Sequence, residues 1–268
     1  MDSKTILLDV GGTFVKCRDG RQVAMPSSGS AEQIAAALQQ SVGPLEGVRG
    51  IGVAIPGPFD YTQGVFLMRH KFAAVYGQNF ATLAGIPDSI PVKYLHDVNA
   101  PLLGCIEMLA LKDANAALIT LGTGLGFSIA IKGKVQFGPD GSPARGLWDL
   151  PYKDGILEDA VSARGITAAY ARLGGEAELS AKDIAMRAYQ GEELALKTYE
   201  LLGSCLAEAL APIVRETGID ILLFGGQISA SLSLFEKPLR DALGALLIER
   251  SPEGAVFEGL ASLFKETN

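Results

Sequence analysis

Two short glycine turns and one aspartate between them hold the residues best suited to chemistry. Gly11-Gly12-Thr13 follows an apolar run ending in Asp9-Val10, and Gly122-Thr123-Gly124 follows the apolar run 117–121. Glycine has no Cβ and tolerates positive φ, so backbone N–H groups in such turns can approach an anion closely. Asp97 lies between the two turns. This pattern predicts that the two turns bind a polyphosphate from opposite sides, with Asp97 nearby as a general base.

The sequence after each turn excludes the best-known glycine-rich phosphate sites. Rossmann and P-loop sites require a helix directly after the glycines. Here an alternating stretch follows instead, at 14–17 and at 127–131, and each stretch ends at a further glycine. Such stretches favour hairpins of two antiparallel strands. One hairpin turn in each half of the chain predicts two related lobes that close on a nucleotide.

The segment His96-Asp97-Val98-Asn99 follows a predicted strand and precedes a predicted helix. Asn99 is predicted to cap this helix, and Pro101 is tolerated in its first turn. The Asp97 carboxylate is then free to take a proton from an attacking hydroxyl. The alternative is that Asp97 itself caps the helix.

Composition narrows the class of protein. The chain has 268 residues, 48% hydrophobic and 20% charged, which allows one large or two medium domains. A net charge of -7 without a basic run argues against nucleic-acid binding. The N-terminus shows neither a signal-peptide pattern nor a membrane span, which favours a cytoplasmic protein. Cys17, Cys105 and Cys205 fit no disulfide framework or zinc spacing, so we expect buried thiols.

Predicted strands and helices alternate, which is typical of an α/β fold. Strands are expected at 6–9, 50–55, 92–95, 116–121 and 221–224, and helices at 31–40, 100–111, 181–190 and 192–217. The lobe boundary is predicted near 111–114, which gives an N-terminal lobe of 1–112 and a C-terminal lobe of 113–268. The irregular segment 138–155 is predicted to form a loop near the mouth of the cleft.

Five ordered segments resemble the ROK (repressor, open reading frame, kinase) family of the actin-like, sugar kinase and Hsp70 superfamily, over nearly the whole chain. They are the two glycine turns, 52–60, 97–100 and 221–229. The resemblance implies a two-lobed actin-like ATPase (ribonuclease H-like) α/β fold with the active site in the interlobe cleft. The amphipathic stretch 258–265 is expected to pack back on the N-terminal lobe.

By this resemblance the protein is an ATP-dependent, glucokinase-like sugar kinase in which Asp97 deprotonates a hexose hydroxyl. Positioning and charge neutralisation carry most of phosphoryl transfer, and Asp9 is expected to hold Mg²⁺ through water. The residues expected to bind ATP are Asp9, Gly11, Gly12, Thr13, Lys16, Gly122, Thr123, Gly124, Gly225 and Gly226. For Lys16, a solvated strand position is an equal alternative.

The resemblance also predicts a sugar site. Its expected residues are Pro56, Gly57, His70, His96, Asp97 and Glu158. His70 and His96 stand where relatives place asparagines, which indicates an acceptor other than plain glucose, with an acidic or amino substituent near His70, Lys71 and Arg145. Two ordinary structural histidines are the alternative. Glu158 either contacts sugar hydroxyls, as in relatives, or simply begins a helix.

The chain departs from the family after the second turn, and this makes it an atypical member. Many relatives carry a Glu-x-Gly-His motif and a cysteine-rich zinc loop there, whereas this chain has neither, so no structural zinc is expected. A catalytically reduced sugar- or nucleotide-binding protein is therefore an alternative, as is a polyphosphate donor in place of ATP. Only four residues precede Thr5, which argues against the DNA-binding segment of ROK repressors. A homodimer is expected.

Overall fold

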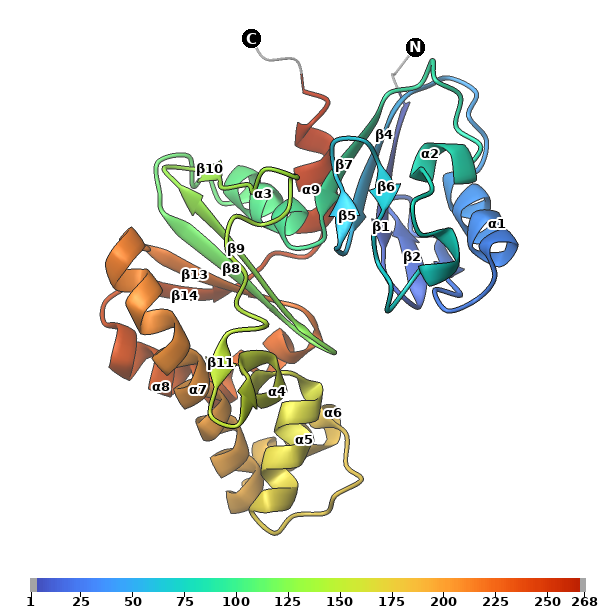
Figure 1. The fold of residues 1–268 in the computed structure, drawn as a ribbon. Coiled ribbons are helices and arrows are strands. Elements are labelled where there is room, and N and C mark those ends of the chain that lie inside the picture. The colour runs from blue at the N-terminus through green and yellow to red at the C-terminus, as the bar shows by residue number, and fades with distance from the viewer. Residues whose placement is uncertain (1–3, 266–268) are drawn as a thin grey trace. The chain divides into compact units, whose positions relative to one another are not determined.

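The structure is a computed structural model that describes residues 4–265 (Figure 1). The chain forms two compact units. Unit 1 comprises 4–110, 137–144 and 252–265, and unit 2 comprises Leu111–Gln136 and Arg145–Ser251. Each unit contains one five-stranded sheet. The predicted mixed α/β architecture is confirmed.

The sheet of unit 1 has the strand order β3-β2-β1-β4-β7. β1 and β2 form an antiparallel hairpin that β3 extends, and β4 and β7 run parallel to β1. The strands are β1 (Lys4–Val10), β2 (Phe14–Cys17), β3 (Gln22–Ala24), β4 (Val48–Ile55) and β7 (Val92–His96). Smaller elements follow β4, namely β5 (Phe59–Asp60), β6 (Val65–Phe66), η1 (Ala73–Val75) and α2 (Phe80–Leu83).

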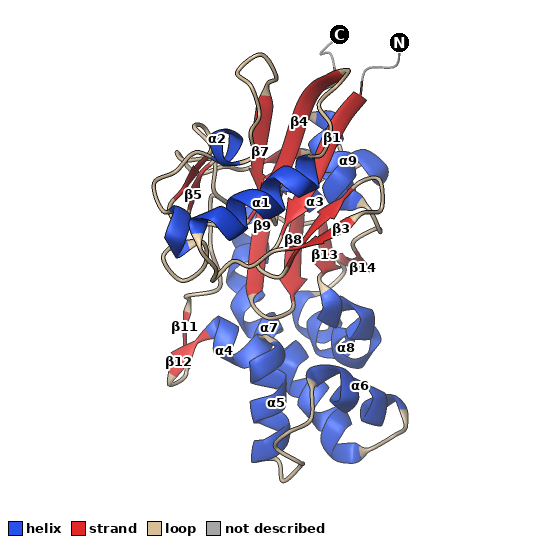
Figure 2. Cartoon of the chain, turned by 90° about the vertical axis from the view of Figure 1, so that its right-hand side faces the viewer, coloured by secondary structure: helices blue, strands red, loops and turns tan. Residues whose placement is uncertain are grey.

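Helices cover both faces of this sheet (Figure 2). α1 (Ala31–Val42) begins with a capping box between Ser30 and Gln33, and its apolar side packs on the face that carries Leu8. α3 (Asn99–Met108) and α9 (Ala255–Ser262) lie on the opposite face, which carries Leu7. Successive side chains of β1 therefore point to opposite faces of the sheet and enter two separate hydrophobic cores.

α3 and α9 pack closely because glycines stand at their contact. A Cβ on Gly104 would lie 1.7 Å from the Ala255 carbonyl oxygen, and one on Gly259 would lie 1.9 Å from the Ala100 carbonyl oxygen. Neither position accepts a side chain without separating the helices. The C-terminal helix therefore belongs to unit 1, beneath β1 and β4.

The sheet of unit 2 has the order β10-β9-β8-β13-β14 and repeats the strand directions of unit 1. Its strands are β8 (Ala116–Leu121), β9 (Leu125–Ile131), β10 (Lys134–Val135), β13 (Ile221–Gly225) and β14 (Leu247–Arg250). Its helices are α4 (Leu157–Val161), α5 (Ala163–Arg172), α6 (Ala181–Tyr189), α7 (Glu193–Thr217), η2 (Gln227–Ser231) and α8 (Leu232–Leu243). A short hairpin joins β11 (Pro151–Tyr152) to β12 (Gly155–Ile156).

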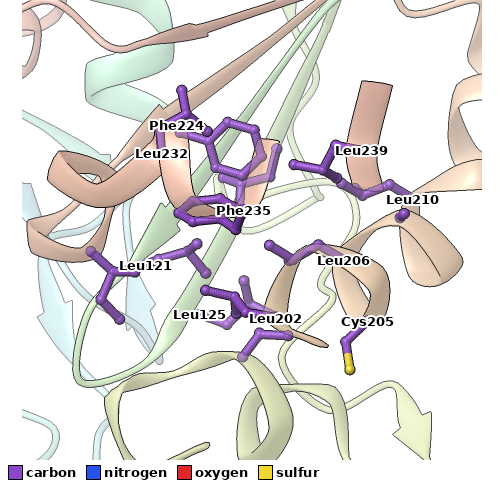
Figure 3. Packing of buried hydrophobic residues seen from close by; sticks show 14 of the residues in the cluster. Leu121, Leu125, Leu202, Cys205, Leu206, Leu210, Phe224, Leu232, Phe235 and Leu239 are labelled. Atoms are coloured by element: carbon purple, nitrogen blue, oxygen red, sulfur yellow. The ribbon is translucent and has the colours of Figure 1, made fainter. Parts of the chain in front are cut away.

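The core of unit 2 holds the second glycine turn in place (Figure 3). Leu121 and Leu125, on either side of the turn, are 0% and 6% exposed. The rings of Phe224 on β13 and Phe235 on α8 meet edge to face, with centroids 5.6 Å apart. The turn therefore projects from a close-packed base, which limits its movement.

Two further observations concern the whole described chain. Cys17, Cys105 and Cys205 are buried thiols, as predicted. Among residues 4–265, no helix combines the length and the apolar character that a bilayer crossing requires.

Candidate functional site

Three predicted segments meet at the carboxyl edge of the unit 1 sheet. Asp9 pairs with Ala54, and Ile55 pairs with His96 on the next strand. Because these strands are parallel, the residues after them emerge at one edge. The fold thereby brings Asp9, the Pro56-Gly57 segment and Asp97 together.

Asp9 is the most perturbed acid in this group. Burial, with the negative charge of Asp97, raises its pKa to about 6, while Lys16 opposes the shift. Lys16 is exposed and faces Asp9 across the β1–β2 ladder. Two carboxylates held close together in a partly buried site favour a bound cation.

Asp97 is available for proton transfer. Its side chain is 42% exposed, and its Oδ1 lies 2.8 Å from His96 Nδ1. The backbone N–H of Val98 also points at His96 Nδ1, at 3.2 Å. With a proton on Nδ1, His96 donates to Asp97 Oδ1 and orients the carboxylate. With the proton on Nε2 alone, Nδ1 accepts from Val98 N instead and offers Asp97 no hydrogen bond.

The predicted capping role of Asn99 is wrong. α3 begins at Asn99 itself, Val98 occupies the cap position, and no side chain caps the helix. Asn99 is fully buried, and its Nδ2 donates to the Gly141 carbonyl oxygen at 3.4 Å. Asp97 does not cap the helix either, so its carboxylate is free of that duty.

The Pro56-Gly57 segment faces the aromatic pair Tyr61 and His96, whose ring centroids lie 5.7 Å apart. A Cβ on Gly57 would lie 3.2 Å from the Tyr61 hydroxyl and 3.5 Å from His96 Nε2. Tyr61 donates to the Ile55 carbonyl oxygen at 3.1 Å, and burial raises its pKa, so the phenol stays protonated. His70, in contrast, is exposed and has no side-chain partner among residues 4–265.

The predicted loop 138–155 divides between the two units. Its first part, 137–144, belongs to unit 1, where the Asp140 carbonyl oxygen accepts from Tyr61 N at 3.3 Å. Its second part contains the β11–β12 hairpin of unit 2. Arg145 also lies in unit 2, where its Nη1 is 2.8 Å from Glu216 Oε2. The prediction of one continuous loop is therefore wrong.

The first glycine turn closes the β1–β2 hairpin, as predicted, through a Gly11 N to Phe14 O bond of 2.9 Å. A Cβ on Gly12 would lie 3.3 Å from Lys71 Cδ and 3.4 Å from Cε. The stem of Lys71 thus rests on the turn. Its ammonium has no ion-pair partner within the described part of the chain.

The backbone at Lys71 is positioned by the next residue, Phe72. Phe72 is fully buried, with φ of 54°, and its N–H donates to the Ser27 carbonyl oxygen at 2.7 Å. The sequence shows Arg69-His70-Lys71 but gives no sign that this segment folds over Gly12. Sequence reasoning therefore missed Lys71 as a residue at the phosphate turn.

In unit 2 the second glycine turn and the Gly225-Gly226 turn stand side by side. β8 and β13 are parallel neighbours with Gly225 opposite Thr120. A Cβ on Gly226 would lie 2.3 Å from the Leu121 carbonyl oxygen, and Gly226 has φ of 79°. The second turn also joins two antiparallel strands, as predicted. Beside Gly122 there is open space, because a Cβ there would meet nothing within 4 Å.

Glu158 supports the second turn from behind. Its Oε2 accepts from Leu125 N at 2.9 Å and would lie 2.8 Å from a Cβ on Gly124. Its Oε1 lies 2.8 Å from Arg164 Nη2. Both carboxylate oxygens of Glu158 therefore have structural partners in unit 2. Glu158 also lies in the first turn of α4.

Comparisons with known proteins identify the family. The chain matches the model of the ROK family over residues 4–262. It belongs to the ROK family. An N-acetylmannosamine kinase of Escherichia coli O157:H7 is 26% identical over 243 residues, which cover 84% of this chain and 83% of that protein.

Solved ROK structures agree with the fold. A ROK family glucokinase from Streptomyces griseus, crystallised with glucose and AMPPNP, has a TM-score of 0.78 at 22% identity and covers 97% of this chain and 98% of its own. Glucokinase from Parabacteroides distasonis has a TM-score of 0.79 at 20% identity, covering 97% and 96%. The predicted family and the actin-like α/β fold class are confirmed.

Side chains that could hold a metal in this ROK protein lie at the edge of the unit 1 sheet. Within residues 4–265, no three His, Cys, Asp or Glu side chains gather closely enough to form a metal site of their own. The donors at the edge of unit 1 are two carboxylates, Asp9 and Asp97. Asp9 is the expected ligand, and a single carboxylate suits Mg²⁺, which keeps several waters and takes further oxygens from substrate phosphates.

Proposed function

We propose that this chain transfers the γ-phosphoryl group of ATP to a hydroxyl of a hexose or hexose derivative, with Asp97 as the general base. The broader class, a sugar kinase, is confirmed by the curated relatives. The observation that best supports the proposal is the exposed Asp97 carboxylate, which lies 2.8 Å from His96 Nδ1 and whose charge helps to raise the pKa of Asp9.

Proton transfer is assigned to Asp97. An acceptor hydroxyl that hydrogen-bonds its free oxygen loses its proton to the carboxylate as the oxygen attacks phosphorus. His96 holds the other oxygen, so the attacking geometry is set before the reaction. The non-catalytic alternative has no supporting observation at this site, because both carboxylates and the first turn are present.

Charge neutralisation is assigned to cations around the first turn. Lys71 lies over Gly12, and Lys16 faces Asp9, so both can approach phosphate oxygens at this edge. Asp9 would hold Mg²⁺, which neutralises phosphate charge when bound. In unit 2, the second turn offers N–H groups to phosphates, and the Gly225-Gly226 turn leaves room for adenosine.

The acceptor is proposed to be an N-acylated hexosamine, with N-acetylmannosamine first among the candidates. The support is the similarity to N-acetylmannosamine kinases, together with His96 at a position that the resemblance assigns to a sugar-binding asparagine. His96 Nε2 and the Tyr61 hydroxyl face Gly57, and they are the groups we assign to acceptor recognition.

ADP release from Mg·ATP across N-acetylmannosamine, N-acetylglucosamine, glucose and mannose tests the proposal. We expect turnover that depends on the sugar and is highest with an N-acetylated hexosamine. Adding inorganic polyphosphate in place of ATP tests the donor. Binding of ATP without turnover on any hexose derivative would overturn the kinase assignment.

A further inference from the structure

Unit 2 contains a cavity of about 460 Å³ that is separate from both glycine turns. It lies between the β11–β12 hairpin and helices α4, α5 and α7. The lining residues that matter here are Lys153, Asp159, Ala169, Arg172, Leu202 and Cys205. A volume of this size is within the range of small-molecule sites.

The cavity has a rigid floor and a tethered roof. α5 contributes Ala169 and Arg172 three residues apart, and α7 contributes Leu202 and Cys205, also three apart, so each helix presents one face. The hairpin forms the roof and is tied to α7 by Tyr152, whose hydroxyl donates to Glu208 Oε2 at 3.0 Å.

The charges at the cavity favour an anionic ligand. Arg172 and Lys153 have no ion-pair partner within residues 4–265, and Lys153 Nζ lies 5.1 Å from the centre of the Tyr152 ring. The carboxylate of Asp159 is already paired, 2.8 Å from Arg164 Nη2. Asp154, next to Lys153, is exposed, and its single negative charge balances only one of the two positive charges of Lys153 and Arg172.

The apolar walls require the rest of the ligand to be apolar. Ala169 and Leu202 are 9% and 2% exposed, and both line the cavity. The hydroxyl of Thr198, another lining residue, is already bonded to the Leu194 carbonyl oxygen at 2.8 Å. A compact apolar body with one carboxylate matches these walls and cations.

One arginine joins the cavity to the second glycine turn. Arg164 Nε donates to Asp159 Oδ1 at 2.9 Å, and its Nη2 donates to Glu158 Oε1 at 2.8 Å. Glu158 in turn accepts from Leu125 N at the end of the turn. Asp159 and Glu158 are adjacent on α4, so a ligand that displaces this helix also displaces the support of the turn.

We propose that this cavity binds a small organic carboxylate with an apolar body, and that its occupancy changes nucleotide affinity through Arg164 and Glu158. The second part rests on the proposed function, because it assumes that the turn binds nucleotide. The first part stands without it. Exposed ion pairs are individually weak, so the coupling is expected to be modest.

Calorimetric titration with benzoate and cyclohexanecarboxylate tests the site, with benzyl alcohol and cyclohexylmethanol as uncharged counterparts. The carboxylates are expected to bind roughly tenfold more tightly than the alcohols, and Arg172→Gln to remove this preference. Arg215→Gln, an exposed arginine of α7 outside the cavity, is the matched control. Equal binding of acids and alcohols, or an unchanged preference in Arg172→Gln, would overturn the assignment.

Two further measurements locate the ligand. Ala169→Met places a flexible side chain in the cavity and should weaken benzoate binding roughly tenfold, and Ala160→Met serves if the first variant does not fold. Benzoate should also slow alkylation of Cys205 by iodoacetamide but not that of Cys17 or Cys105. Unaltered Cys205 alkylation at saturating benzoate would place the ligand elsewhere.

ADP affinity with and without saturating benzoate tests the coupling, and it needs no turnover. We expect a change of about fivefold in wild type and a smaller one in Arg164→Met. Identical ADP affinities in wild type would overturn the coupling. Because both titrations measure binding, a negative result here is distinct from a failed search for a sugar acceptor.

Discussion

The two glycine turns occupy the same place in sheets of the same topology, yet their surroundings differ. In unit 1 the turn after β1 has Asp9 at its base and the stem of Lys71 across Gly12. In unit 2 the turn after β8 has Thr120 at the position of Asp9, and open space beside Gly122. The first turn thus has charged side chains at its base and across it. The charged neighbour of the second turn, Glu158, is already bonded to Leu125 N and paired with Arg164.

This difference indicates a division of labour. The charged side chains at the first turn can take up a proton or neutralise charge that develops in the transition state, and we assign the backbone N–H groups of the second turn to holding phosphates. In the proposed function, unit 1 carries the groups for chemistry, and unit 2 carries the groups that hold the donor.

Asp97→Asn should lower sugar-dependent kcat by roughly 10² to 10⁴, because the amide cannot accept the hydroxyl proton. ADP affinity should stay within about twofold, since the change removes no donor-holding group. Steady-state kinetics and calorimetry separate the two effects. His96→Asn is the companion variant, and its kcat loss should be smaller. If Asp97→Asn retained wild-type kcat, Asp97 would not be the general base.

Asp9→Asn should change the pH dependence of stability. The folded pKa of Asp9 is about 6, above its ordinary value of 3.8, so the folded state binds this proton more tightly than the unfolded state. Stability is thus lost as pH rises from about 4 to 6, by up to about 3 kcal/mol. Urea unfolding in the absence of Mg²⁺ at pH 4 and pH 7 should show Asp9→Asn more stable than wild type only at pH 7. Asp88→Asn, an exposed control, should follow wild type.

Much of this contrast was predictable from sequence because the turns are local features. Apolar runs broken by glycine, followed by alternating residues, predict hairpins without any knowledge of tertiary contacts. Both hairpins, the long helix α7 and the parallel strands β4, β7 and β13 lie where the pattern placed them. Asp97 stands between a strand and a helix, as the pattern predicts.

The rest depended on contacts between distant segments. Lys71 meets Gly12 through a loop whose course is set by buried Phe72. Asn99 turned inward to Gly141, 42 residues away, instead of capping its own helix. The short strands β3 and β14, which have only three and four residues, carry too little periodicity to be recognised alone.

Lys71→Met should raise KM for ATP roughly ten- to a hundredfold, the cost of one lost charge-assisted hydrogen bond to phosphate. Lys16→Met, the other cation near the first turn, should have a smaller effect because it is exposed and already faces Asp9. Lys71→Arg should recover part of the activity. Equal KM values for Lys71→Met and wild type would show that the Lys71 ammonium does not bind ATP at the first turn.

Gly122→Ala and Gly12→Ala compare the two turns directly. Neither glycine has positive φ, so alanine strains neither backbone. A Cβ at Gly122 meets nothing in the protein, so its effect must come from the ligand: we expect about a tenfold loss of ADP affinity with little change in unfolding free energy.

At Gly12 the same methyl group presses on the Lys71 stem and on Ser27 Oγ, 3.4 Å away. Gly12→Ala should therefore lower kcat, and this effect should shrink in a Lys71→Met background, because the two changes then act on one contact. The Gly122→Ala effect should be unaffected by Lys71→Met. If the effects of Gly12→Ala and Gly122→Ala were both additive with that of Lys71→Met, Lys71 would not distinguish the first turn from the second.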